Sequence, residues 1–383
     1  MIDLFKPVAE ACRVEVALDQ RRPIAVVGAG AIVDLAHLPA YHRGGLRVVG
    51  ITDIDRDRAR AVADRHGIDH VYPDLDSLLA DDEVEVVDVA VPAQAQPGIA
   101  RRVLVAGRHM LGQKPFALSS ATAAELADLA EDNEVVLAVN QQLRFDEGVA
   151  AAHRIMELGW LGEITSLAIQ VDIWSEWSDW PWMLELDELE VWNHSVHYHD
   201  LVRWFLGEPE SVYCAAGRTP GQAPRAETRT ITTYCFAGGA RALVTCNHEN
   251  AWGDNSATLR LEGNRGAVRG TLGLLYDYPT GRPDTLEVTS DLLPTDGWVP
   301  YPVTTRWLPD AFLGPMASLL AAAAAGRGAL PLTSARDNVR TLAVVEAIYR
   351  SVQTGRAEAP APPLARPSVG ARVDGVALGD ERP

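Results

Sequence analysis

A short apolar run that leads into two glycines one residue apart is the strongest constraint on the fold. Residues 23–27 read Pro-Ile-Ala-Val-Val, the composition of a buried strand, and Gly28 and Gly30 follow. The first glycine permits a tight turn, and the second lets a ligand approach the backbone. The first amides of the next helix, at Ala31 and Ile32, then face an anion that the helix dipole favours. The stretch therefore predicts a turn that holds a pyrophosphate.

Val33 replaces the third glycine of the full dinucleotide fingerprint, so an ordinary strand-to-helix turn stays open as an alternative. Residues 46–52 form a second apolar strand pattern that ends at Asp53, about 20 residues beyond the glycines. A carboxylate there accepts hydrogen bonds from the adenosine ribose and repels a 2′-phosphate. We therefore expect NAD, with NADP disfavoured. Asp53 could instead cap the next helix, and Arg56 or Arg58 could attract a phosphate.

The charge of the chain limits its partners. Its 34 basic and 52 acidic residues give a formal charge of −18, which repels nucleic acid and anionic membranes and is compatible with a small neutral substrate. No apolar run is long enough to span a bilayer, and residues 1–22 lack the apolar core of a signal peptide. The four cysteines show neither a C-x-x-C pair nor metal-ligand spacing. We therefore expect reduced thiols, no metal site and a cytoplasmic protein.

Strand and helix patterns alternate through the first part of the chain. Helical patterns over residues 56–66, 75–80, 99–106 and 121–133 separate apolar strand patterns over residues 84–91, 109–112 and 135–140. This alternation predicts a Rossmann fold, an α/β doubly wound parallel sheet. Ligands of such sheets bind at the carboxyl ends of the strands. That rim carries Gly28, Asp53, Pro92, Gln113, Lys114 and Asn140.

Alternating apolar and polar residues dominate the second part. Strand patterns over residues 164–174, 229–236, 240–247, 258–262 and 285–289 predict an open, largely antiparallel sheet in an α+β domain. Helical patterns cover residues 147–159, 191–206, 309–325 and 335–354, and we expect the last two to close this domain. The predicted parts are an N-terminal extension (1–22), a Rossmann dinucleotide-binding domain (23–145), a substrate-binding and oligomerisation domain (146–358) and a proline-rich tail (359–383).

Tryptophans gather in one loop of the second part. Five of the ten in the chain are Trp174, Trp177, Trp180, Trp182 and Trp192. Aromatic faces stack on the apolar faces of sugars, so this loop is a candidate substrate wall. A small hydrophobic cluster or a subunit contact explains the tryptophans almost as well.

The helical pattern over residues 191–206 places Asn193 and His197 on one side, four residues apart. An N-cap asparagine and a buried core histidine are the alternative. A metal site built from His194, His197 and His199 is disfavoured, because residues 197 and 199 of a helix point in nearly opposite directions and no H-E-x-x-H pattern is present.

The motifs follow one another in a fixed order. They are Gly28-Ala29-Gly30, His37-Leu38-Pro39-Ala40, Asp53, Pro92, Gln113-Lys114-Pro115, Asn140 with Arg144-Phe145, and the segments 158–164, 197–207 and 343–351. Together they resemble the Gfo/Idh/MocA oxidoreductases, the relatives of glucose-fructose oxidoreductase and inositol dehydrogenase. The resemblance covers residues 23–355. Around residues 113–115 and the tryptophan-rich loop the chain is similar to apiose and other sugar dehydrogenases.

Three positions depart from the usual pattern of that family. Gln113 stands where a glutamate usually precedes the lysine, and Gln96 where a histidine usually follows the proline by four residues. Asn193 stands where an aspartate usually precedes the histidine by four residues. The resemblance still implies that Gln96, Gln113, Asn140 and Arg144 border the cofactor.

The resemblance implies hydride transfer between NAD and a hydroxyl or carbonyl of a small neutral sugar, polyol or sugar derivative. Lys114 would hold the alcohol oxygen, His197 would accept its proton, and Asn193 would orient the His197 ring. Because an asparagine carries no charge, Lys114 could share the base role. His194 and the tryptophans at 174, 177, 180 and 182 would contact the substrate. Aldoses, including pentoses and apiose, are expected first, followed by inositols and glycosides.

Two other functions stay open. In an offshoot of the family, NAD stays bound and is reduced only transiently during glycoside cleavage or epimerisation. The three amide replacements also suit a non-catalytic NAD-binding regulatory protein. The resemblance further implies a homo-oligomer assembled through the open second sheet.

Overall fold

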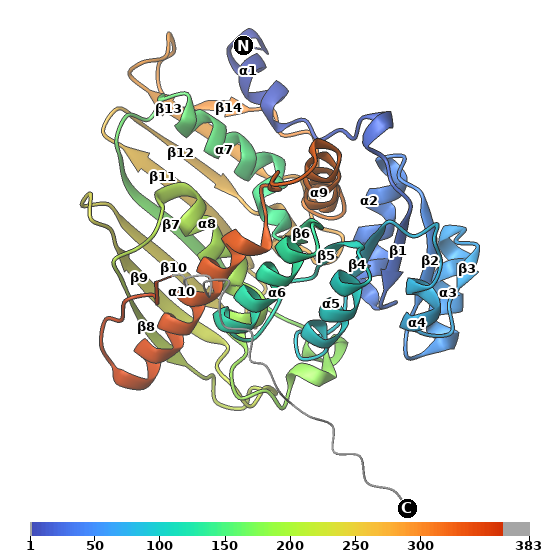
Figure 1. The fold of residues 1–383 in the computed structure, drawn as a ribbon. Helices are drawn as coiled ribbons and strands as arrows, with labels where there is room; N and C mark the ends of the chain where they lie inside the picture. The colour runs from blue at the N-terminus through green and yellow to red at the C-terminus, as the bar shows by residue number, and fades with distance from the viewer. Residues whose placement is uncertain (1, 363–383) are drawn as a thin grey trace, which may run out of the picture.

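The computed structural model describes residues 2–362, and its first half contains a six-stranded parallel sheet (Figure 1). The strand order is β3-β2-β1-β4-β5-β6, which confirms the predicted doubly wound Rossmann sheet. The strands are β1 Ile24–Val27, β2 Val48–Thr52, β3 His70–Val71, β4 Val86–Val89, β5 His109–Gly112 and β6 Leu137–Val139. The connecting helices are α2 Leu38–Arg43, α3 Arg56–His66, α4 Leu75–Leu79, α5 Gln96–Val105 and α6 Ser120–Asp132. Most of the predicted proline-rich tail, residues 363–383, lies outside the described residues.

The glycine turn follows β1 at the centre of this sheet. All four residues of β1 are buried, and β2 and β4 flank it in parallel. The chain proceeds from β1 to β2 on one side and later returns to β4 on the other. A crevice therefore forms at the carboxyl ends of β1 and β4, where such sheets bind their ligands.

The second half forms an eight-stranded sheet in the order β14-β13-β12-β11-β7-β10-β9-β8. Its strands are β7 Ile164–Asp172, β8 Ser211–Gly217, β9 Arg229–Cys235, β10 Arg241–Asn247, β11 Ser256–Gly263, β12 Gly266–Thr271, β13 Thr285–Ser290 and β14 Val299–Tyr301. Neighbours pair antiparallel except β7 and β10, so the predicted largely antiparallel sheet is confirmed. The sequence patterns miss β8, β12 and β14, because small residues and glycines weaken the alternation of the first two and β14 is short.

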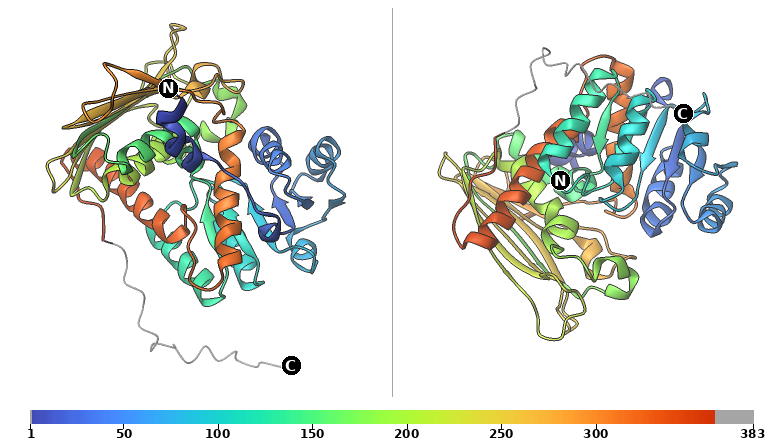
Figure 2. Two further views of the ribbon diagram at one scale, coloured as in Figure 1. Left: turned by 90° about the horizontal axis from the view of Figure 1, so that it is seen from above. Right: turned by 60° about the horizontal axis from the view of Figure 1, so that its bottom comes forward.

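Helices cover one face of this sheet, and Figure 2 shows no helix of the described residues over the other. The covering helices are α1 Ile2–Cys12, α7 Glu147–Glu157, α8 Val196–Leu206 and α10 Ala335–Thr354. Burial alternates along β9 and β10, as expected for a sheet with one packed face. The N-terminal helix α1 belongs to this layer, because the ring of Phe5 packs on Tyr301 and Trp160 with centroid distances of 5.4 and 6.2 Å.

The two sheets share one continuous apolar core. Helix α9, Leu313–Ala325, packs on β5 and β6 of the first sheet, whereas its sequence pattern led us to expect that it closes the second domain. Helix α10 contacts α6 on one side and β8 on the other. An apolar helical stripe shows that a face is buried but not which sheet it covers. No helix within residues 2–362 is long and apolar enough to cross a membrane.

Candidate active site at the carboxyl rim of the first sheet

The turn after β1 has the shape that a pyrophosphate needs. Gly28 has a φ of 106°, and a Cβ at this position would overlap the carbonyl oxygen of Ala90. A Cβ on Gly30 would meet nothing within 4 Å, so open space lies above the second glycine. The first helical backbone bond runs from Val33 N to Gly30 O at 3.0 Å, which leaves the preceding amides turned outward. These residues fit a dinucleotide phosphate.

Asp53 lies beside this turn and not at a helix cap. Its Oδ2 accepts a hydrogen bond from Ala29 N, and its Oδ1 accepts one from Asp55 N, both at 2.7 Å. The N-cap of α3 is Asp55, whose side chain accepts from Arg58 N at 3.1 Å. The capping alternative for Asp53 is therefore wrong. Arg58 also pairs with the Asp55 carboxylate, at 3.2 Å.

A buried polar cluster beneath the rim joins Gln113 and Asn140, as the strand ends predicted. Nδ1 of His37 lies 2.7 Å from Oδ2 of Asp88, which also accepts a hydrogen bond from the Tyr41 hydroxyl at 2.7 Å. Nε2 of His37 faces the side-chain amides of Gln113 and Asn140 at 3.3 and 3.2 Å. This cluster was not predicted from the sequence. A carboxylate inside the apolar run 84–91 is the signal that could have found it.

Gln96 braces the lysine-bearing segment from inside the protein. Its side chain is fully buried, and Nε2 donates to the carbonyl oxygens of Gln113 and Pro115 at 2.8 and 2.9 Å. Pro92, at the end of β4, is exposed. Gln96 therefore has a structural role through its amide nitrogen, and contact of its Oε1, which has no hydrogen-bond partner within residues 2–362, with the cofactor stays a prediction.

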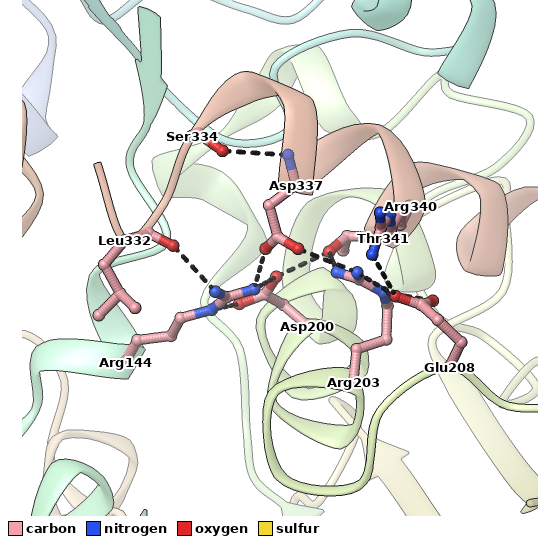
Figure 3. Close-up of polar contacts among 9 residues, drawn as sticks. All are labelled: Arg144, Asp200, Arg203, Glu208, Leu332, Ser334, Asp337, Arg340 and Thr341. Carbon is pink, nitrogen blue, oxygen red and sulfur yellow. Dashed lines mark hydrogen bonds and ion pairs between the residues drawn. The ribbon is translucent and has the colours of Figure 1, made fainter. Parts of the chain in front are cut away.

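Arg144 is likewise engaged inside the protein, in the ionic network of Figure 3. Its Nε and Nη2 donate to Asp200 at 2.6 and 2.7 Å, Nη2 also reaches Asp337 at 2.6 Å, and Nη1 donates to Leu332 O at 3.1 Å. Arg203 donates to the other oxygen of Asp337 at 3.1 Å. The network ties the segment after β6 to α8 and α10. The resemblance predicts that Arg144 borders the cofactor, but in the structure its Nε and Nη2 donate to the carboxylates of Asp200 and Asp337.

Lys114 reaches from the end of β5 to the second half of the molecule. Its Nζ donates to the backbone carbonyl of Asn193 at 2.5 Å, and its own amide donates to Oε1 of Gln113 at 2.7 Å. The side chain is half-buried, and burial lowers the pKa of its amine from 10.5 to about 8. This lysine can therefore act both as a cation and as a base near neutral pH.

The helix with the histidines starts as a π-helical turn, Val191–Ser195, and continues as α8. Nδ2 of Asn193 donates to Leu189 O at 3.1 Å, within its own helix. The side chain that reaches His197 is Gln142, with 3.4 Å between Gln142 Nε2 and His197 Nε2. The prediction that Asn193 orients the His197 ring is therefore wrong, because Gln142 makes that contact. Gln142 lies on the 3₁₀ turn after β6, and no sequence pattern points to this position.

Both histidines next to Lys114 are held neutral. Burial, and then the charge of Lys114, lowers the pKa of His197 well below its usual value. Burial and the charges of His248, Lys114 and His197 do the same for His194. Nδ1 of each ring is enclosed and has no hydrogen-bond partner within the described residues. Gln142 Oε1 and Asn140 Oδ1 are also buried without partners there. Enclosed polar atoms of this kind need a ligand or water to complete them.

His248 and Glu190 extend this cluster and were not found from the sequence. The His248 ring packs against His194 in a tilted arrangement with a centroid distance of 4.3 Å, and its Nε2 lies 3.6 Å from Oε1 of Glu190. Burial favours the neutral form of Glu190, but the hydrogen bond and charge of His248 outweigh it, so the pKa of this carboxyl is lowered. The buried carboxylate of Glu190 is therefore connected to the site of Lys114 through the rings of His248 and His194.

The predicted tryptophan wall divides into buried and exposed members. Trp177 is 5% exposed, meets the His194 ring edge-on at 5.6 Å, and donates from Nε1 to Glu249 at 2.8 Å. Trp174 and Trp182 are 47% and 43% exposed. Only Trp177 of the five touches a histidine of the site, and Trp174 lines a cavity beside it.

The remaining tryptophans pack elsewhere. Trp192 is buried and stacks on Tyr349 with a centroid distance of 6.0 Å. Trp180 packs against Tyr278 at 5.7 Å. The hydrophobic-cluster alternative therefore describes this part of the loop. Within residues 2–362 no group of three or more histidine, cysteine or acidic side chains could hold a metal ion.

Comparisons with known proteins agree with this fold. Residues 22–141 match the family described as "Oxidoreductase family, NAD-binding Rossmann fold", and residues 149–273 match the "GFO/IDH/MocA C-terminal domain". The chain is 27% identical over 362 residues to the D-apiose dehydrogenase of Paraburkholderia graminis, covering 91% of this chain and 93% of that protein. It is 26% identical over 345 residues to D-xylose 1-dehydrogenase (NADP(+)) 2 of Haloferax volcanii, covering 87% and 98%.

One solved structure shows the same fold. It is an oxidoreductase from Agrobacterium radiobacter in complex with NAD+, L-tartaric acid and magnesium. The TM-score is 0.78 at 22% identity, with 88% of this chain and 98% of that chain covered. The shared architecture thus extends over both sheets.

Proposed function

The chain belongs to the Gfo/Idh/MocA family of oxidoreductases, and we propose that it transfers a hydride between NAD and a hydroxyl-bearing carbon of a small neutral sugar, polyol or sugar derivative. One contact carries this proposal. Lys114, at the rim where a Rossmann sheet binds its cofactor, reaches Asn193 O at 2.5 Å on the helix that bears the histidines. A cofactor on the first sheet and a substrate on the second would meet at this point.

Lys114 would hold the reacting oxygen of the substrate. In oxidation its neutral amine can take the hydroxyl proton, and in its charged form it stabilises negative charge on the oxygen. Bound NAD supplies the hydride acceptor at its nicotinamide ring. The pKa of about 8 allows both forms of the lysine at physiological pH.

His197 would hydrogen-bond the substrate at Nδ1, whose hydrogen-bonding capacity is unused, while Gln142 holds the ring at Nε2. His194 would bind a second hydroxyl at its own enclosed Nδ1. Asn193 contributes its backbone carbonyl, which fixes Lys114. The base role therefore falls mainly to Lys114, because neither histidine has a carboxylate on its ring.

The cofactor would lie along the rim. The turn at Gly30, with the amides of Ala31 and Ile32, would take the pyrophosphate, and Asp53 would accept the ribose hydroxyls. Gln113 and Asn140, with Pro92 at the edge, would border the nicotinamide end. The open space over Gly30 and the unpartnered Oδ1 of Asn140 support this path.

A neutral sugar is supported by the charge of the chain and by its relatives. A formal charge of −18 disfavours phosphorylated or acidic substrates. The relatives named as apiose and xylose dehydrogenases point to pentoses as the first substrates to examine.

The deciding experiment mixes purified full-length protein with NAD or NADP and a panel of pentoses, hexoses, inositols and glycosides, and follows nicotinamide absorbance. At least one sugar should reduce NAD, and Lys114→Met should abolish the signal without weakening NAD binding. Glycoside cleavage with NAD retained and no net absorbance change would indicate transient oxidation. NAD binding without turnover on any substrate would indicate a regulatory protein.

We also propose a cytoplasmic homo-oligomer. All four cysteines are free thiols, and the uncovered face of the second sheet exposes Tyr213 and Ile231. Light scattering of the purified protein tests this assembly, since a monomeric mass would contradict it.

A further inference from the structure

A cavity of about 660 Å³ opens where β7 and β10 end, beside the tryptophan-rich loop. This volume lies within the range of small-molecule sites, about 300–1,000 Å³. Its lining includes Trp174, Asn250, Asn255, Tyr276, Asp277 and Arg282. The proposed chemistry at Lys114 and the histidines does not use these residues.

The cavity presents aromatic faces next to polar groups. Trp174 is 47% exposed, which is unusual for so large an apolar side chain. The guanidinium of Arg282 lies 3.6 Å from the centroid of the Tyr276 ring and holds that ring in place. A saccharide site requires aromatic rings that stack on the C–H faces of the sugar. It also requires amides and carboxylates that form hydrogen bonds with the hydroxyls.

Hydrogen bonds within the protein fix the cavity walls in advance. Trp174 N donates to Oδ1 of Asn255 at 3.0 Å, and Nδ2 of Asn250 donates to Oδ1 of Asp254 at 3.0 Å. Trp174 also pairs with Glu249 through a β-bridge. A wall that is ordered before the ligand arrives loses less entropy on binding.

The charge of the lining selects a neutral ligand. The charged side chains of the lining are two carboxylates, Asp254 and Asp277, and one cation, Arg282. Two carboxylates against one guanidinium disfavour an anionic ligand. An uncharged glycosyl unit suits this lining.

The cavity and the histidines of the site are bordered by the same segment of the chain, which follows β7. Ser175, next to Trp174, lies with its Oγ 2.9 Å from Nδ1 of His248, whose ring packs against His194. Trp177 meets His194 edge-on, and its Nε1 donates to Glu249 at 2.8 Å. The same short segments therefore line both spaces.

We propose that this cavity is a subsite for a second glycosyl unit, so that the preferred substrate is a neutral glycoside or disaccharide. Its reacting ring lies at Lys114 and its other ring stacks on Trp174. This assignment rests on the function proposed above for the Lys114 site.

The test compares monosaccharides with neutral disaccharides such as maltose, cellobiose, sucrose and trehalose, on the full-length protein. At least one disaccharide should show a kcat/KM about tenfold above that of its constituent sugars. Trp174→Ala should remove about tenfold of kcat/KM for that disaccharide, the effect of about one stacking contact, and leave the monosaccharides within about twofold. Trp252→Ala is the matched control, because Trp252 is exposed in the loop that carries Asn250 and Asn255 and does not line the cavity.

Calorimetry of the same disaccharides without NAD separates this inference from the proposed function. Saccharide binding that Trp174→Ala weakens and Trp252→Ala does not weaken supports the subsite, even if no sugar reduces NAD. Equal effects of the two substitutions, or no preference for any disaccharide in binding and turnover, would overturn it. A Trp174→Ala protein with an altered oligomeric mass but unchanged saccharide binding would also overturn it, in favour of a contact between copies of the chain.

Discussion

Lys114 offers the sharpest test of the proposed chemistry, because the sequence contains only two lysines, Lys6 and Lys114. Lys6 is exposed on α1, whereas burial lowers the pKa of Lys114 from 10.5 to about 8. A group with that pKa is neutral in about one molecule in ten at pH 7 and about one in a hundred at pH 6. If the neutral amine takes the hydroxyl proton, kcat/KM for oxidation should rise about 100-fold from pH 6 to a plateau above pH 9.

Two measurements check this prediction. Protein labelled with carbon-13 at the lysine ε-carbon should give two side-chain signals, and Lys6→Met should remove one of them and so assign the other. The Lys114 signal should titrate near pH 8. Lys114→Arg keeps the positive charge but has no neutral form in this range, so it should lose both the activity and its rise with pH.

The two outcomes that refute the reasoning are distinct. A Lys114 signal that titrates near 10.5, as in a solvated lysine, would show that burial does not depress its pKa. A signal near 8 combined with an oxidation rate that falls between pH 7 and 9 would show that Lys114 acts as a cation, which leaves the base role to His197.

Three further predictions follow from the packing. Gly30→Ala should keep the thermal stability but lose NAD binding, because its Cβ would enter only the open space above the turn. Gly28→Ala should destabilise the fold, because its Cβ would clash with Ala90 O. Calorimetry and NAD titration compare the two variants, and equal losses of stability would contradict the assignment. Arg144→Met leaves the buried Asp200 carboxylate unpaired and should cost about 3–5 kcal/mol in urea unfolding, and a loss under about 1 kcal/mol would show that the network is dispensable. Trp177→Ala should cost about 3–5 kcal/mol because the ring is buried, while an equal loss for the half-exposed Trp174→Ala would argue against a ligand-facing role for that ring.

Local sequence patterns were sufficient for five of the six strands of the first sheet, and only the two-residue edge strand β3 was not predicted. Periodicity, the two glycines and the helix stops define the elements, and helix α3 begins and ends where its pattern predicts, with Gly67 at a φ of 66° as its C-cap. The second sheet was recognised as open and largely antiparallel, but β8, β12 and β14 lack a clear alternation and were missed. Lys114 and His197 were predicted to act together because the motifs that contain them belong to the pattern of one family, although they lie in different halves of the chain.

Only the tertiary structure decided which side chains meet. Gln142 reaches His197 in place of Asn193, Gln96 braces the backbone beside Lys114, and the donors of Arg144 are taken by carboxylates. The sequence determines which residues have the chemistry for a site, because residue type and local spacing are written in it. It does not show partners that lie far apart along the chain, since those contacts depend on how two sheets and their shared helices pack into one core.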